Sequence, residues 1–236
     1  MYGTTSRFQT PDGGLITLAA DGYDLDDPWS AQVRLTARDP ARLLPTGHQV
    51  RGFDIEFAGN YDYVIAEVLH GTVTDRLDSR GGQLLLARGD QQALALWRGP
   101  FHEAAIWLSD PRTPTAHALR YFDGITFTDS AAGLVVESQT PDVEEVETIE
   151  VIKRVPGVGY LDVKNAAAAF ELVPTWAGAK ASAGEIWRQI DDDLPVFILA
   201  NTTTVTVLSG EGKQKSTEGP RLEFLDRLTT LSWTER

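Results

Sequence analysis

The sequence contains no cysteine, and this absence excludes a disulfide scaffold, a thiolate metal site and a cysteine nucleophile. Basic residues are scarce, because 21 Lys and Arg stand against 34 Asp and Glu and give a formal net charge of −13. A charge this negative attracts no phosphate backbone and argues against general nucleic-acid binding. We therefore expect protein partners and no nucleic-acid partner.

Long apolar runs are missing as well. The longest, at 194–200, has the length of a strand and falls far short of the roughly 18–20 residues that span a bilayer. Residues 1–7 carry no apolar segment of the kind that a signal peptide needs. We expect no membrane insertion and no signal peptide. The hydrophobic fraction of 42% is typical of a packed globular chain.

Most of the sequence has the pattern of short strands. Phe53, Ile55 and Phe57 alternate with Asp54 and Glu56, which indicates a strand with one buried and one wet face. Similar segments punctuated by Gly, Asp and Pro occur at 15–19, 31–37, 64–73, 83–88, 93–98, 104–108 and 194–200. The pattern predicts a mainly β (α+β) fold of antiparallel sheets or barrel-like domains with a few short helices.

Three segments carry helix signals. The first, at 39–45, has Asp39 as N-cap, Pro40 at the first helical position and Pro45 as a stop, which predicts about one helical turn. Thr113-Pro114 opens an apolar stretch, with Pro at the first helical position. Ser182 and Glu185 match a capping box, with Ile186 and Ile190 four residues apart behind it. We expect a short helix in each place.

An acidic stretch at 140–150 indicates the division between two domains. Its carboxylates repel one another and favour an extended, solvated path. A linker that continues into an edge strand and an acidic partner-binding tail are both compatible with this composition. We predict an N-terminal β-rich domain at 1–139 and a C-terminal β-rich domain at 140–236.

A faint internal repeat relates 113–129 to 219–235. Ungapped alignment brings Pro114 onto Pro220 and preserves class at Phe127/Trp233 and Asp129/Glu235. Each copy predicts a short helix that turns into a strand. Diverged duplication, which makes the C-terminal domain a copy of the N-terminal one, and chance resemblance both explain the similarity. Under duplication, a trimer of such chains would present six similar faces.

The candidate reactive groups form no recognisable catalytic set. The four histidines lack metal-ligand spacing, and His102-Glu103 is either an acid–base pair or an ordinary structural pair. Asp54 and Glu56, near Tyr61 and Tyr63, have the residue types of a glycosidase carboxylate pair, or they keep a strand face soluble.

Three other features have a structural and a functional interpretation. The acidic loop 21–27 offers oxygens to Ca²⁺ or is a solvated turn. Gly157-Val158-Gly159-Tyr160 indicates a turn, because Asp162 stands where a dinucleotide fingerprint needs glycine. The tryptophans are core or interface anchors, or platforms for sugars; they are Trp29, Trp97, Trp107, Trp176, Trp187 and Trp233.

From these observations we assign no catalytic, cofactor-binding or metal-binding residue and expect no cofactor. The leading hypothesis is a non-enzymatic structural protein that acts through subunit interfaces in a homo-oligomer or larger assembly. The context that we expect is a virion component, in the tail, tail tip or head decoration of a tailed bacteriophage, assembled in the host cytoplasm. The alternative is a carbohydrate-binding module or a carboxylate-based glycoside hydrolase.

Overall fold

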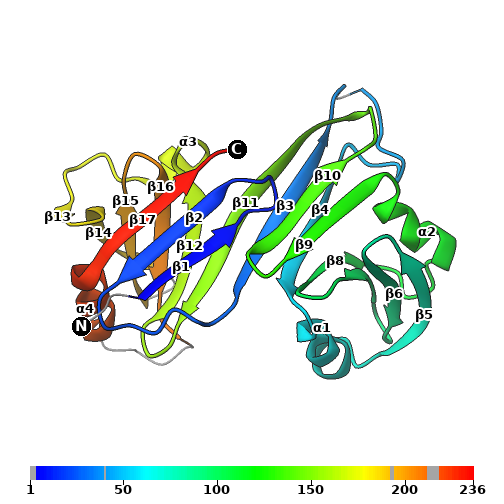
Figure 1. Cartoon of the computed structure of the whole chain (residues 1–236), viewed down its shortest axis with the longest axis horizontal. Helices are drawn as coiled ribbons and strands as arrows, with labels where there is room; N and C mark the ends of the chain where they lie inside the picture. The colour runs from blue at the N-terminus through cyan, green and yellow to red at the C-terminus, as the bar shows by residue number, and fades with distance from the viewer. Residues whose placement is uncertain (1–3, 40, 192–193, 212–217) are drawn as a thin grey trace. The chain divides into compact units, whose positions relative to one another are not determined.

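The structure is a computed structural model that describes residues 4–39, 41–191, 194–211 and 218–236 (Figure 1). Strands make up 53% of it and helices 15%, and its antiparallel sheets do not close into a barrel. The predicted mainly β fold with a few short helices is therefore confirmed. In the part of the chain that is described, no helix has the length and apolar character needed to cross a membrane.

The chain forms two compact units. The central unit comprises Gln9–Gly13 and Ser30–Thr148, and the terminal unit comprises the residues up to Phe8, Gly14–Trp29 and Ile149 onwards. The predicted boundary lay between residues 139 and 140, whereas these units divide at 148–149. The terminal unit also takes in the first strands of the chain, because β2 pairs with the final strand, β17.

The elements of the central unit follow one another as β3 (Trp29–Ala37), β4 (Val50–Phe57), α1 (Asn60–Tyr63), the π-helical turn η1 (Val64–Val68), β5 (Thr72–Ser79), β6 (Gly82–Arg88), β7 (Ala93–Arg98), β8 (His102–Leu108), α2 (Thr115–Leu119), the 3-10 turn η2 (Arg120–Phe122), β9 (Ile125–Ser130) and β10 (Gly133–Ser138). The first residue of β3 belongs to the terminal unit.

The terminal unit contains β1 (Thr4–Gln9), β2 (Leu15–Ala20), β11 (Val143–Val155), β12 (Gly159–Asn165), α3 (Ala166–Ala169), the 3-10 turn η3 (Phe170–Leu172), β13 (Ala179–Ala181), β14 (Gly184–Asp191), β15 (Leu194–Ala200), β16 (Thr204–Ser209), α4 (Gly219–Arg227) and β17 (Leu228–Thr234). The chain crosses between the units within β1 and within β11.

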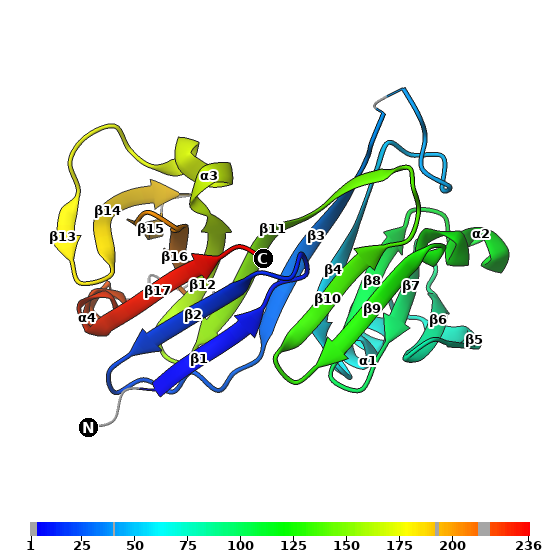
Figure 2. The same cartoon turned by 45° about the horizontal axis from the view of Figure 1, so that its top comes forward.

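The two units have the same strand order. In the central unit the hydrogen-bonded order is β3-β4-β8-β7-β6-β5, and β9 pairs with β10. In the terminal unit it is β11-β12-β16-β15-β14-β13, and β17 pairs with β2 (Figure 2). A short helical segment follows the second strand in both units, and a helix leads into β9 and into β17. Apart from β1, each of these elements of one unit thus has a counterpart in the other.

The register of the strands is the same as well. Gln83 lies opposite Arg98, and Glu185 lies opposite Ala200, each residue being 102 positions after its counterpart. The same offset of 102 relates the pair Leu77–Leu84 to Ala179–Ile186 and the pair Ala95–Ile106 to Phe197–Leu208. The first two strands of each unit correspond with larger offsets, 108 between β4 and β12 and 120 between β3 and β11: Ile55–Ala104 corresponds to Val163–Thr206, and Val33–Phe53 to Lys153–Leu161. The two units therefore share strand order and backbone hydrogen-bonding register, although their side chains differ.

Two glycines illustrate this shared plan. A Cβ on Gly82 would lie 2.2 Å from the carbonyl oxygen of Arg98, and one on Gly184 would lie 2.3 Å from that of Ala200. Both units thus need a residue without a side chain where the fourth strand begins.

The similar segments 113–129 and 219–235 fall on equivalent elements of the two units. The first forms α2, η2 and β9, and the second forms α4 and β17. The predicted change from helix to strand is confirmed in both. A common origin of the two halves stays an inference.

Two predictions of local structure are wrong, and a third, the helical turn at 39–45, includes Pro40, which lies outside the described residues. Part of 64–73 was expected as strand, but 60–68 is helical, because Tyr61, Ile65 and Leu69 turn one face into a core with Leu85 and Leu94. The expected helix at 182–190 is instead β14. A spacing of four residues, as between Ile186 and Ile190, fits one face of a strand as well as one face of a helix.

Candidate functional site

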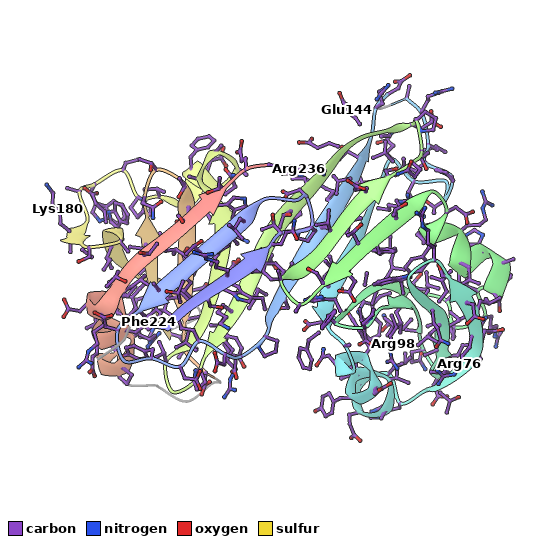
Figure 3. The ribbon with its side chains drawn as sticks, viewed as in Figure 1. Arg76, Arg98, Glu144, Lys180, Phe224 and Arg236 are labelled. Atoms are coloured by element: carbon purple, nitrogen blue, oxygen red, sulfur yellow. The ribbon has the colours of Figure 1, made fainter. Side chains whose placement is uncertain are left out.

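The central unit contains a cluster of carboxylates on β4 and β8. Glu56 lies directly opposite Glu103, and Asp54 is two residues away on the same face of the strand. Glu103 is fully buried; its carboxylate accepts hydrogen bonds from the backbone N–H of Tyr61 at 3.0 Å and from Nε of Arg98. The other end of the Arg98 guanidinium binds Asp62 at 2.8 Å. Arg98, labelled in Figure 3, thus connects a buried carboxylate to α1.

Electrostatics single out Glu56 within this cluster. Burial, followed by the charges of Asp54 and Glu103, raises the pKa of Glu56 to about 7. The same surroundings raise the pKa of the Tyr61 hydroxyl, with burial as the main cause. Glu56 is therefore protonated for a large part of the time near neutral pH, which spares the cluster one negative charge.

In the terminal unit, a lysine stands at the position that corresponds to Glu56. The residue equivalent to Glu56 is Lys164, whose Nζ binds Glu150 at 2.5 Å and Asp162 at 3.0 Å. Asp162 itself is the counterpart of Asp54. In the terminal unit, the positive charge of Lys164 offsets the carboxylates of Glu150 and Asp162. In the central unit, the raised pKa of Glu56 reduces the negative charge beside Asp54 and Glu103.

His102 and Glu103 do not act as a pair. Their side chains lie on opposite faces of β8, because they are consecutive in a strand. His102 Nδ1 instead lies 2.7 Å from Oδ1 of Asp129, and Oδ2 of Asp129 accepts the backbone N–H of Phe101 at 2.8 Å. Asp129 thus ties the turn between β7 and β8 to β9.

The acidic loop at 21–27 is occupied by a cation of the chain itself. Nζ of Lys153, a fully buried residue on β11, donates to the carbonyl oxygens of Leu25, at 2.6 Å, and Asp27. It also lies 5.1 Å from the ring centre of Trp29. Burial lowers the pKa of Lys153 to about 8, against the opposing charges of the loop carboxylates. The ammonium group therefore binds backbone oxygens of this loop, and the carboxylates that were considered as Ca²⁺ ligands lie around it as opposite charges.

The glycine-containing segment 157–160 and the possible metal ligands were also considered in the sequence. Gly157 lies in the turn between β11 and β12, as expected, with a φ of 75°. Among the residues that the structure describes, no three His, Asp or Glu side chains are grouped to hold a metal ion.

The tryptophans divide by exposure. Trp29, Trp97, Trp187 and Trp233 are buried, in agreement with a role as anchors, whereas Trp176 is 61% exposed.

A cavity of about 230 Å³ opens in the central unit, away from the carboxylate cluster. Its aromatic lining comes from Trp97 and Phe127, which stack with ring centres 4.7 Å apart, and from Phe122. Arg80 and Asp123 belong to its lining and are exposed. Nε1 of Trp97 is buried and has no hydrogen-bond partner among the described residues.

Three of these groups, Arg98, Lys153 and Asp129, were not recognised from the sequence as members of a site. Each lies in a strand, and the fold brings it to its partners: Glu103 for Arg98, His102 for Asp129, and the carbonyl oxygens of Leu25 and Asp27 for Lys153.

Comparison with known proteins adds no assignment. No family model, curated protein or solved structure matches this chain.

Proposed function

We propose that the chain is a non-enzymatic building block that associates with further copies of itself in a larger assembly. The observation that carries this proposal is the shared strand order and register of the two units. A chain with two units of the same strand arrangement offers neighbouring copies two surfaces with similar backbone geometry, which suits symmetric assemblies.

The electrostatics of the central unit also favour this proposal. The carboxylate cluster and the cavity share no residue: Asp54, Glu56 and Glu103 belong to the sheet beneath α1, whereas the cavity is lined by other residues. A hydrolase of the glycosidase type needs its two carboxylates beside a space for the substrate. The ion pairs of Arg98 and Lys164 are better explained as internal neutralisation.

The context that we propose for this role is the virion of a tailed bacteriophage, in its tail, tail tip or head decoration. The β-rich, acidic and cysteine-free composition supports it. Mass spectrometry of purified particles made by the genome that encodes the chain tests this part directly. Peptides of the chain at stoichiometric abundance are expected, and their absence from intact particles would refute the virion role.

Self-association is tested separately by sedimentation velocity and light scattering of the purified chain over a wide concentration range. The proposal expects a mass that rises with concentration to a defined multiple of the chain. A monomer at every concentration that turns over a glycoside substrate would favour an enzyme.

Carbohydrate binding is the second candidate, since an aromatic cavity and the exposed Trp176 are features that sugar-binding surfaces use. Binding of the monomer on a glycan array, lost on Trp176→Ala, would favour it over assembly.

A further inference from the structure

The first turn of α1 is held to the sheet by polar contacts with the carboxylate cluster. The backbone N–H of Tyr61 donates to Glu103 at 3.0 Å, and the Tyr61 hydroxyl donates to the backbone carbonyl oxygen of Asp54 at 3.3 Å. Arg98 binds Glu103 and also Asp62 of α1, the latter at 2.8 Å. The attachment of this helix therefore depends on how charge is balanced beneath it.

Glu56 is the group in this cluster whose charge changes near neutral pH. It lies directly opposite Glu103, and Asp54 is two residues away on the same face of β4. Burial, followed by the charges of Asp54 and Glu103, raises the pKa of Glu56 to about 7. After burial and Asp54, Glu56 also contributes to the raised pKa of the Tyr61 hydroxyl, so its charge reaches α1. Glu67, the acidic residue of η1, is exposed.

The helical segment formed by α1 and η1 lies between two residues with positive φ. Gly59, which precedes α1, has a φ of 92°, and His70, which follows the C-cap of η1, has a φ of 49°. A positive φ is uncommon for a residue other than glycine, and the backbone at His70 is therefore strained. Residues at the ends of an element that change the backbone direction in this way act as hinges when the element moves.

The same segment covers an apolar part of the sheet. Its buried side chains pack with those of β6, β7 and β8 in a cluster that consists of Tyr61, Ile65, Leu69, Leu85, Ala87, Leu94, Leu96 and Ala105. This packing keeps the segment closed for most of the time. A change of charge beneath it therefore acts on a small open population.

We propose that α1 and η1 form a pH-controlled lid on the sheet of the central unit, which opens about Gly59 and His70 when Glu56 ionises beside Asp54 and Glu103. The inference goes beyond the proposed function and does not depend on it. Opening brings water to the carboxylate cluster, where a further negative charge is otherwise poorly balanced.

The direction of the pH response follows from linkage. Glu56 ionises more easily in the open lid, so the equilibrium constant for opening rises as the pH increases from the ordinary pKa of 4.5 towards the raised one. The full difference of 2.5 pKa units would multiply the opening constant about 300-fold. Because Glu56 is partly exposed when the lid is closed, we expect a rise of at least about tenfold between pH 5 and pH 8.

Hydrogen–deuterium exchange of the amides at 60–71 tests the proposal at pH 5, 6, 7 and 8, after division by the intrinsic exchange rate at each pH. The wild type is expected to show the tenfold rise, and Glu56→Gln to show an opening constant that does not vary with pH. Glu67→Gln is the matched control and is expected to respond like the wild type. A wild-type opening constant that is independent of pH would overturn the proposal.

His70 is itself titratable, and a second variant separates its effect from that of Glu56. His70→Asn removes the imidazole and keeps a residue type that tolerates positive φ. It is expected to retain the pH response in full. Loss of the response in His70→Asn would assign the pH sensor to the hinge and refute the role of Glu56.

The amides of β7 distinguish opening of the lid from unfolding of the whole unit. The opening constant of the lid is expected to exceed that of β7 at least about tenfold at each pH. It is also expected to change little with urea below the unfolding transition, because local opening exposes little surface. Equal opening constants and equal urea dependence in the two segments would show unfolding of the whole unit and refute the lid.

Discussion

Glu56 gives the most direct test of the electrostatic reasoning. Replacing it by glutamine keeps the shape of the side chain and removes its titration. The pKa of Glu56 is raised from an ordinary 4.5 to about 7 in the folded chain. A carboxyl group with a raised pKa costs no stability while it is protonated, below its unfolded pKa. The fold loses stability as the pH rises from the unfolded to the folded pKa, because in that range the group is ionised in the unfolded chain and still protonated in the folded one.

The magnitude follows from the size of the shift. One pKa unit corresponds to about 1.4 kcal/mol, so the penalty reaches about 3 kcal/mol by about pH 7 and is only about 1 kcal/mol at pH 5. Allowing for the partial exposure of Glu56, we expect the Glu56→Gln variant to gain about 2 kcal/mol over the wild type between pH 5 and pH 8. Glu56→Lys, which copies Lys164 of the terminal unit, is expected to be at least as stable as Glu56→Gln at pH 8.

The measurement is urea unfolding of the wild type and both variants at pH 5, 6, 7 and 8, with the free energy of unfolding extrapolated to water. Glu67→Gln is the matched control, since Glu67 is an exposed carboxylate on η1, and it is expected to change stability by less than about 0.5 kcal/mol throughout. A stability difference between wild type and Glu56→Gln that does not vary with pH would refute the reasoning.

Three further predictions concern the internal contacts, and thermal and urea unfolding measure all of them. Lys153→Met leaves the carbonyl oxygens of Leu25 and Asp27 without their donor and is expected to cost about 2–4 kcal/mol, while Lys180→Met on the surface changes little; equal effects would be evidence against the buried ammonium. Asp129→Asn weakens the attachment of the β7–β8 turn and is expected to cost about 1–3 kcal/mol, with exposed Asp90→Asn as the reference. Gly82→Ala and Gly184→Ala are each expected to cost about 2 kcal/mol or more, whereas Gly219→Ala, where a Cβ meets nothing within 4 Å, is tolerated; a neutral result at only one of the two would contradict the equivalence of the units.

The strands were the most predictable part of this fold. Alternation at 31–37 and 53–57, and the continuous apolar run at 194–200, correspond to β3, β4 and β15. The wrong predictions share one cause. Apolar residues four apart are compatible with both helix and strand, and at 60–68 and 184–191 only packing against other strands decides between them.

The repeat was visible in sequence only at its helix-to-strand segments. The more regular part, from β5 to β8 and from β13 to β16, leaves little trace because hydrogen bonding between backbones fixes register without fixing side chains. Gly82 and Gly184 are an exception, since the close approach of a neighbouring carbonyl demands glycine there.

The sites were less predictable than the fold. Glu56 was recognised as a candidate. Glu103, which lies opposite it on β8, and Arg98 on β7, which binds Glu103, are more than forty residues further along the chain. The acidic loop at 21–27 was interpreted as a possible Ca²⁺ site or a solvated turn, and its contact with Lys153, more than a hundred residues away, was not foreseen. Charge alone in a sequence does not reveal which distant strand supplies the counter-charge.

The pairing of β2 with β17 has a consequence for biosynthesis. All strands of the central unit that follow β3 have left the ribosome once residue 138 emerges, so this half is able to mature while translation continues. The strand β2, at 15–20, pairs with β17 only after residues 228–234 have been synthesised. Premature termination near the last codons would therefore leave one edge of β2 unpaired and open to misassembly, while its other edge still pairs with β1.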